Sequence, residues 1–326
     1  MVWFQPRIAV INRVASGHHD DLLRTVARIC LVSFALHPDL SFFGMASATP
    51  QTLRECFSLP KKSKQVHPGI FVHSIFVEDD LDKDRQAGFY GNVNEQVALV
   101  AEQLAGIPEL EGGFDAIGFS QGGQFLRAYV ERYNSPPIHN LLTFGSQHFG
   151  VSDIPPCGPR DFVCRVARRV VKSAVYGSYA QTNLVQAQYF RDPEQLDAYY
   201  ASNTFLTSIN NEISETRNET YARNLASLNK LVLILFTDDK TVVPKESSWF
   251  ASEVVIDELP GAQRVLSVVD RRSVPMREQP LYQEDWIGLR LLDERGGVVF
   301  GECEGQHMQI GDCWEDFVRV YVGGPV

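Results

Sequence analysis

The stretch FDAIGFSQGGQFLRAYV, residues 114–130, decides the fold of this chain. Its first six residues are mostly apolar, which predicts a short, buried parallel strand. Apolar residues then recur at helical spacing from Phe125 to Val130, which predicts a helix. Between the two lies GFSQG at 118–122, which has the pattern G-x-S-x-G. The order of strand, turn and helix indicates an α/β fold with Ser120 on a sharp turn.

Ser120 is the candidate nucleophile. Small residues beside such a serine let two backbone segments approach closely and leave the hydroxyl exposed above the edge of the sheet. The alternative is a glycine-rich turn in which the serine is incidental. Because a serine hydroxyl is a weak nucleophile at neutral pH, the catalytic interpretation requires a histidine to take its proton and a carboxylate to orient that histidine.

Chain order restricts the choice of histidine, since α/β-hydrolases carry their residues in the order serine, acid, histidine. Only His139, His148 and His307 lie after the serine. His139 is expected in a proline-rich loop just before an apolar strand at 141–144. His307 follows the apolar segment at 298–300 and precedes a final amphipathic helix, as expected for a loop at the end of a strand. We therefore assign His307 as the base.

The acid is expected on a loop between the serine and the histidine. The strongest buried-strand signal in that interval is LVLILF at 231–236, which is followed by Thr237, Asp238 and Asp239. Adjacent aspartates point in different directions, so one can reach the histidine while the other caps the turn or faces water. Spacing alone does not choose between them.

Several separated motifs match one known family in the same order along the chain. They are GFSQGGQFLRA at 118–128, SPP at 135–137, GSQH at 145–148, QY at 188–189 with DP at 192–193, NET at 218–220, WF at 249–250, and EGQH at 304–307 followed by Gln309. With these motifs the chain resembles the palmitoyl-protein thioesterases, lysosomal enzymes that remove fatty acyl groups from cysteine. The resemblance runs from about His67 to the C-terminus.

Between the expected strands at 141–144 and 231–236, apolar residues from Phe162 to Ala174 recur at helical spacing, which predicts a helical cap insertion at about 150–228. The resemblance implies an α/β-hydrolase fold, with a mostly parallel central sheet and flanking helices. It implies Ser120 as nucleophile, Asp239 rather than Asp238 as acid, and His307 as base. The implied activity is hydrolysis of long-chain acyl thioesters on protein cysteines through an acyl-enzyme. The family needs no cofactor, and the sequence shows no metal-ligand spacing.

An oxyanion hole requires two hydrogen-bond donors. An α/β-hydrolase takes one from the backbone N–H of the residue after the serine, here Gln121. In the family the second comes from an early loop, where a His-Gly motif precedes an apolar residue. The best match here is Phe43-Gly44-Met45, which assigns the N–H of Met45. Phe43 replaces the family histidine and no aspartate follows, so the chain departs from the family at this loop.

Residues 1–42 do not resemble the family's opening of signal peptide, linker and first strand. Segment 1–21 has little apolar periodicity. The apolar run at 29–36 starts too late for a signal peptide and lacks a small-residue cleavage site, so we interpret it as a buried strand or helix. A divergent or wrongly predicted first exon is our hypothesis, which sequencing the 5′ end of the transcript would test. We treat 1–42 as an atypical segment and 43–326 as one α/β-hydrolase domain.

Six cysteines are compatible with an oxidising compartment. By the resemblance, Cys157 and Cys164 match a family disulfide. The pairing of the other four stays open: Cys30, Cys56, Cys303 and Cys313. The last two flank the candidate base and are either free or paired with each other. The sequon at Asn218 favours a secretory route, and the resemblance implies a lysosomal, vacuolar or secreted protein.

Composition narrows the function classes further. The 326 residues are 44% hydrophobic and 21% charged, as expected for a soluble enzyme with one large core, and no stretch is long enough to span a membrane. The net charge of -10 argues against nucleic-acid binding. Three hypotheses remain: a thioesterase acting on S-acylated proteins, an acyl-CoA thioesterase or lipase/esterase of the same fold, and a non-catalytic acyl-binding protein. The sequence makes no prediction of oligomeric state.

Overall fold

The computed structural model describes residues 8–13, 63, 66, 67, 69–78, 80–154, 171–256 and 271–323. The predictions that involve Met45, the pair Cys157 and Cys164, and the partners of Cys30 and Cys56 lie outside these residues. In the described ranges, no helix combines the length and the apolar character needed to cross a membrane.

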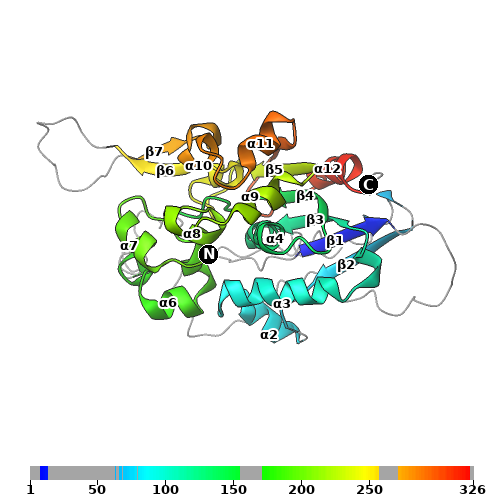
Figure 1. Ribbon diagram of the computed structural model, residues 1–326, viewed down its shortest axis with the longest axis horizontal. Helices are drawn as coiled ribbons and strands as arrows, with labels where there is room; N and C mark the ends of the chain where they lie inside the picture. Colours follow the sequence, from blue (N-terminus) through cyan, green and yellow to red (C-terminus); the bar gives the residue numbers. More distant parts are fainter. Residues whose placement is uncertain are drawn as a thin grey trace, which may run out of the picture.

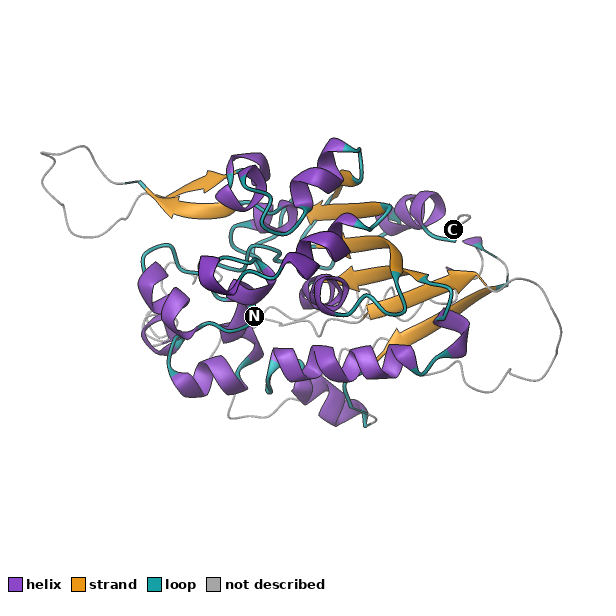
Figure 2. Cartoon of the chain, viewed as in Figure 1, coloured by secondary structure: helices purple, strands orange, loops and turns teal. Residues whose placement is uncertain are grey.

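In the part of the chain that the structure describes, a six-stranded sheet forms the centre, with strand order β2-β1-β3-β4-β5-β8 (Figures 1 and 2). Its strands are β1 (Ile8–Arg13), β2 (Ile70–Ile75), β3 (Phe114–Phe119), β4 (Ile138–Phe144), β5 (Lys230–Phe236) and β8 (Val298–Cys303). The four strands from β3 to β8 run parallel, whereas β1 is antiparallel to both of its neighbours. A separate antiparallel hairpin consists of β6 (Ser252–Val255) and β7 (Arg271–Val274). The prediction of a mostly parallel central sheet is confirmed.

Helices connect and cover these strands. Among the described residues, the α-helices are α2 (Leu81–Ala87), α3 (Val93–Ala105), α4 (Gln121–Arg132), α6 (Ser178–Asn183), α7 (Leu196–Ser202), α8 (Leu206–Ile209), α9 (Glu219–Ala226), α10 (Pro280–Gln283), α11 (Leu289–Glu294) and α12 (Cys313–Tyr321). Short 3-10 helices are η2 (Pro108–Leu110), η3 (Val185–Tyr189), η4 (Ser214–Thr216), η5 (Lys245–Trp249) and η6 (Met276–Glu278). Helices α6 to α9 fall between β4 and β5, in the segment for which we predict a helical cap; residues 155–170 of that segment lie outside the described part.

Side chains alternate between the two faces of the sheet along each strand, and helices cover both faces. On β5, Leu231 and Leu233 belong to one apolar cluster together with residues of α3, α4 and α9. Val232 and Ile234 belong to a second cluster, on the opposite face, with residues of α12. Figure 1 shows α4 and α12 on either side of the strands. The near-continuous apolar run of β5 therefore reflects burial on both faces.

Two features differ from the sequence-based expectations. His139 lies within β4, not in a loop before it, because the parallel ladder already pairs Phe114 with Ile138. The strand Ile8–Arg13 was not predicted, since a short apolar run does not by itself distinguish a strand from other structure. That strand lies within the segment 1–42 and pairs with both β2 and β3 in the central sheet.

Candidate active site

Ser120 occupies a strained turn between β3 and α4. Its backbone has φ 52° and ψ −125°, a conformation that non-glycine residues rarely adopt. A Cβ added to Gly118 would lie 2.4 Å from the Cα of Gly123, and a Cβ on Gly123 would lie 2.0 Å from the Oγ of Ser146. The turn therefore requires glycine at both positions, the second being one residue beyond the G-x-S-x-G pattern.

The structure brings Ser120, Asp239 and His307 together from three strand ends. Ser120 follows β3, Asp239 follows β5 and His307 follows β8, and these parallel strands end at the same edge of the sheet. The Nε2 of His307 lies 3.0 Å from the Oγ of Ser120, and its Nδ1 lies 2.6 Å from the Oδ2 of Asp239. All three residues are buried or nearly so. A continuous hydrogen-bonded chain thus links the hydroxyl to the carboxylate.

The geometry distinguishes the two adjacent aspartates. Asp239 is buried, and its Oδ1 accepts hydrogen bonds from the backbone N–H groups of Thr241 (2.8 Å) and Val242 (3.0 Å), which leaves Oδ2 directed at His307. Asp238 is exposed on the adjacent position of the loop. Of the two, Asp239 is the one in contact with the histidine.

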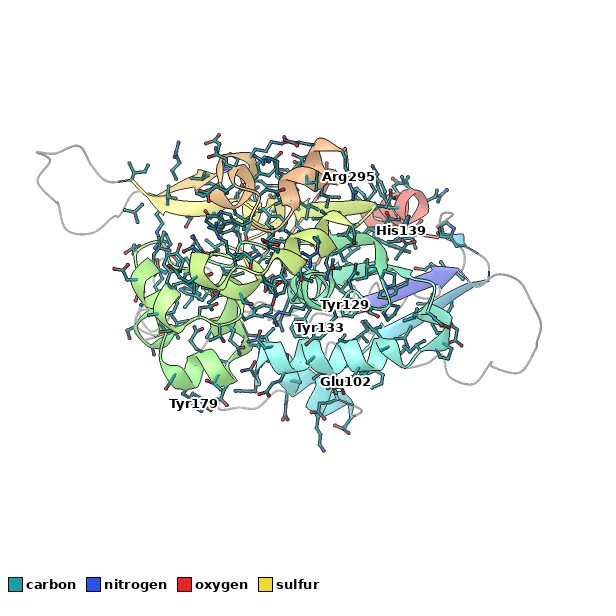
Figure 3. The ribbon with its side chains drawn as sticks, viewed as in Figure 1. Glu102, Tyr129, Tyr133, His139, Tyr179 and Arg295 are labelled. Carbon is teal, nitrogen blue, oxygen red and sulfur yellow. A yellow bond between two sulfur atoms is a disulfide. The ribbon has the colours of Figure 1, made fainter. Side chains whose placement is uncertain are left out.

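The other two histidines that follow the serine are placed differently. His139 lies at the amino end of β4, and Figure 3 shows it near α12, at the end of the strand opposite to the serine turn. His148 is fully buried, and its ring stacks on Phe250 at 4.7 Å, with Nε2 3.0 Å from the Oγ of Thr143. Burial holds the pKa of His148 well below its usual value, so this imidazole is neutral.

A buried ion pair on α4 was not predicted from the sequence. Arg127 and Glu131, one turn apart on α4, are both fully buried and lie 3.1 Å apart. Arg127 also donates to the backbone carbonyls of His148 (2.9 Å) and Ile209 (3.1 Å). Burial raises the pKa of Glu131 to about 7 in spite of the nearby guanidinium. An arginine amid apolar residues of a predicted core helix was the only available signal in the sequence.

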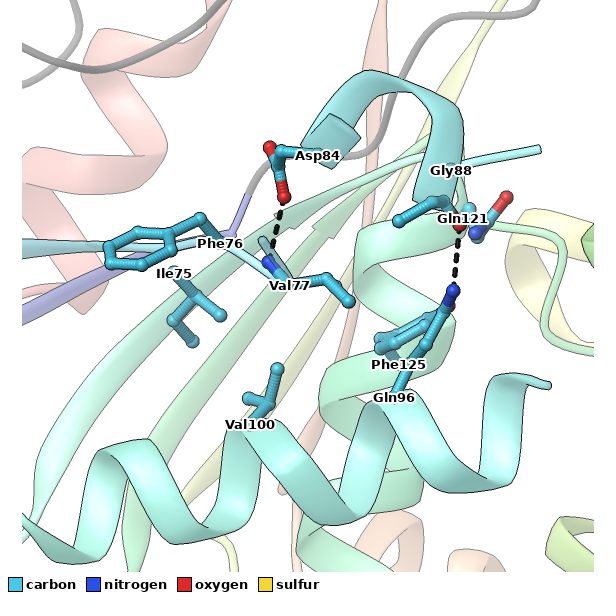
Figure 4. A pocket seen from close by; sticks show the side chains of 10 residues that line it. Ile75, Phe76, Val77, Asp84, Gly88, Gln96, Val100, Gln121 and Phe125 are labelled. Carbon is cyan, nitrogen blue, oxygen red and sulfur yellow. Dashed lines mark hydrogen bonds between the residues drawn. The ribbon is translucent and has the colours of Figure 1, made fainter. Parts of the chain in front are cut away.

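Gln121 begins α4, so its backbone N–H is one of the first four in the helix, which have no acceptor within the helix. Its side-chain Oε1 accepts a hydrogen bond from the hydroxyl of Tyr189 at 3.4 Å. Beside Gln121 lies a pocket lined by Phe76, Val100 and Phe125 among others (Figure 4). Its volume of about 30 Å³ has room for roughly two water molecules. In the described ranges, no cluster of three or more His, Cys, Asp or Glu could hold a metal ion.

The structure also describes Cys303, Cys313 and Asn218, three residues singled out in the sequence. Cys303 and Cys313 form a disulfide with their Cα atoms 5.7 Å apart, which resolves the alternative that the sequence left open. Asn218 is exposed at the start of α9, where its Oδ1 accepts a hydrogen bond from the N–H of Thr220 at 2.9 Å. Its side chain caps this helix and is accessible from solvent.

A family model described as palmitoyl protein thioesterase matches residues 42–307. The chain belongs to this family. It is 41% identical over 255 residues to palmitoyl-protein thioesterase 1 of Caenorhabditis elegans, covering 78% of this chain and 80% of the relative. Palmitoyl-protein thioesterase 3 of Dictyostelium discoideum is 35% identical, with 72% of this chain and 73% of that relative covered. A lysosomal thioesterase PPT2 homolog of Drosophila melanogaster is 28% identical, with 82% of this chain and 84% of that relative covered. The thioesterase family membership expected from the sequence motifs is thereby confirmed.

Proposed function

We propose that this chain is a palmitoyl-protein thioesterase, which hydrolyses long-chain acyl thioesters on the cysteines of S-acylated proteins. The observation that carries the proposal is the hydrogen-bonded chain from Ser120 through His307 to Asp239, within the segment that matches the family model. Relatives that match most of the chain are named palmitoyl-protein thioesterases. The three residues act as nucleophile, base and acid.

In the first step the Nε2 of His307 takes the proton of the Ser120 hydroxyl while Oγ attacks the thioester carbonyl carbon. The contact of 3.0 Å is within reach of this transfer. The carbonyl oxygen becomes negatively charged and accepts a hydrogen bond from the backbone N–H of Gln121. The second donor is the N–H of Met45, which lies outside the described residues. When the tetrahedral intermediate collapses, the carbon–sulfur bond breaks and His307 returns its proton to the departing cysteine sulfur.

The second step repeats this chemistry with water. His307 takes a proton from the water, whose oxygen attacks the acyl carbon, and then protonates Oγ as the fatty acid leaves. Asp239 holds the imidazole with Nδ1 as the donor and stabilises the imidazolium that forms in both steps. The short Asp239–His307 contact of 2.6 Å supports this role.

We also propose a lysosomal, vacuolar or secreted location. Relatives at 26–28% identity are named lysosomal thioesterases. Glycosylation at Asn218 fits this route, because the side chain is exposed and the chain carries its sequon. A second disulfide between Cys157 and Cys164 is part of the same proposal.

Hydrolysis of an S-palmitoylated cysteine peptide tests the proposal, with Ser120→Ala and His307→Ala as the variants. We expect activity in the parent and its loss, by about a thousand-fold or more, in both variants while their folds are retained. Matched oxygen-ester and acyl-CoA substrates serve as comparisons. Turnover of those alone would make the chain an esterase or acyl-CoA thioesterase, and palmitate binding without any turnover would make it an acyl-binding protein.

A further inference from the structure

The disulfide Cys303–Cys313 joins the two ends of the loop that carries His307. Cys303 is the last residue of β8 and Cys313 is the first residue of α12. We propose that this disulfide is a positioning element for catalysis, which keeps His307 in register with Ser120, and that its reduction lowers turnover. The inference rests on the proposed function, because it assigns His307 the role of base.

The first half of the loop is held by the residues that directly follow strand β5. The N–H of Thr237 donates to the carbonyl of Cys303 at 3.0 Å, and the N–H of Asp238 donates to the carbonyl of Gly305 at 2.8 Å. The N–H of Gly305 in turn donates to the Oγ1 of Thr237 at 3.1 Å. These bonds fix the chain up to two residues before His307.

The second half returns through tight turns. Met308 and Gly311 both have positive φ, and a methionine adopts this conformation only where its surroundings impose it. Met308 and Ile310 are buried in the cluster that also contains Cys303. The disulfide closes this half covalently, because it attaches the start of α12 to the end of β8.

The two sulfur atoms differ in accessibility. Cys303 is 1% exposed, whereas Cys313 is partly exposed and can be reached by a reductant. A water-soluble phosphine reduces the bond with one water molecule: the S–S bond breaks, the phosphine is oxidised to its oxide, and both cysteines become thiols. The buried side chains keep α12 in place, but the covalent limit on the loop is lost. An imidazole displaced by about 1 Å from its partner can cost on the order of a hundred-fold in rate.

The test compares the full chain with its C303A/C313A double variant, each with and without a phosphine reductant. Palmitate released from an S-palmitoylated peptide is measured by mass spectrometry, which free thiols do not disturb. The rate at which a fluorophosphonate labels Ser120 reports the activated nucleophile without any thioester. Alkylation and mass measurement confirm the state of Cys303 and Cys313, and circular dichroism confirms the fold.

We expect reduction of the parent to lower kcat and the labelling rate by about ten-fold or more, with KM within about two-fold, and reoxidation to restore both. The double variant is expected to show the lowered values and no response to the phosphine. Parent-like kcat and labelling in the folded double variant would overturn the inference. An equal loss on reduction in both proteins would do the same, because it would place the effect at other cysteines.

The experiment also distinguishes failure of this inference from misfolding of the variant and from failure of the proposed function. If the double variant does not fold, the reduced and reoxidised parent decides the question by itself, since an unchanged labelling rate after verified reduction refutes the positioning role. If the oxidised parent is labelled at Ser120 but does not hydrolyse the palmitoylated peptide, the proposed function fails, while the dependence of labelling on the disulfide still tests this inference.

Discussion

Asp239→Asn separates the proposed catalytic role of this carboxylate from its structural role. The Oδ1 atom accepts two backbone N–H groups of its own loop, and Oδ2 contacts the Nδ1 of His307. An asparagine keeps an oxygen for the two loop hydrogen bonds. Its amide nitrogen faces the imidazole and donates, so Nδ1 becomes the acceptor and the proton moves to Nε2. The imidazole then has no lone pair directed at Ser120.

The expected loss in kcat is about ten-thousand-fold, the size of the effect when a triad aspartate becomes asparagine and the tautomer is wrong. This corresponds to about 5.5 kcal/mol in activation free energy. The free energy of unfolding should change by only about 1 kcal/mol, because the loop hydrogen bonds survive and no buried donor is left without an acceptor. KM should stay near the parent value, since the change affects the transition state rather than substrate binding.

Asp238→Asn is the matched control, because Asp238 is the exposed neighbour on the same loop. The assay measures kcat and KM for an S-palmitoylated peptide, together with denaturant unfolding of all three proteins. We expect the control to lie within about two-fold of the parent. A folded Asp239→Asn protein within about ten-fold of the parent kcat would refute the reasoning, as would a larger loss in Asp238→Asn.

Three further predictions concern a glycine after the serine turn, a buried carboxyl group on α4 and the sequon. Gly123→Ala places a methyl group 2.0 Å from the Oγ of Ser146, so we expect a loss of about 1–3 kcal/mol in unfolding free energy and a lower kcat. The control is Gly112→Ala, whose new Cβ meets nothing within 4 Å. Equal melting temperatures of the two variants would contradict the argument. Burial raises the pKa of Glu131 from 4.5 to about 7, so the folded parent binds the extra proton and its unfolding free energy should fall by about 3 kcal/mol as pH rises through that window. In denaturant titrations across this pH range, the unfolding free energy of Glu131→Gln should lack this decline. The same dependence of unfolding free energy on pH in both proteins would contradict the prediction. Thr220→Ala removes the sequon but keeps the backbone N–H that donates a hydrogen bond to Asn218. The secreted variant should therefore lose one endoglycosidase-sensitive shift in gel mobility, while its unfolding free energy stays within about 0.5 kcal/mol of the parent value. An unchanged mobility would show that the sequon is not used.

Local patterns predicted the elements around the serine well. The apolar run and helical spacing of 114–130 became β3 and α4, and the run at 231–236 became most of β5. The last amphipathic segment became α12. These predictions succeeded because periodicity depends on neighbours along the chain, which share one environment. The strand Ile8–Arg13 was missed because its place in the sheet depends on pairing with residues far along the chain.

The residue types and the chain order of the site could also be predicted from the sequence, since each candidate follows a recognisable strand. The choice of Asp239 over Asp238 came only from resemblance until the loop geometry showed which carboxylate contacts the imidazole. The roles assigned to Met45 and to the pair Cys157 and Cys164 stay predictions.

The sequence by itself determined a serine on a strand-to-helix turn, a later histidine loop and the family of the chain. Only the tertiary structure decided which aspartate contacts His307, that Cys303 and Cys313 are paired, and that Arg127 and Glu131 form a buried ion pair on α4. The physical reason is the range of the interactions. Periodicity and turn chemistry act over a few residues, whereas the contact between Ser120 and His307 joins residues 187 positions apart and exists only after the strands have set their ends side by side. Arg127 and Glu131 are close in sequence, but their surroundings come from distant segments, such as those that supply the carbonyls of His148 and Ile209.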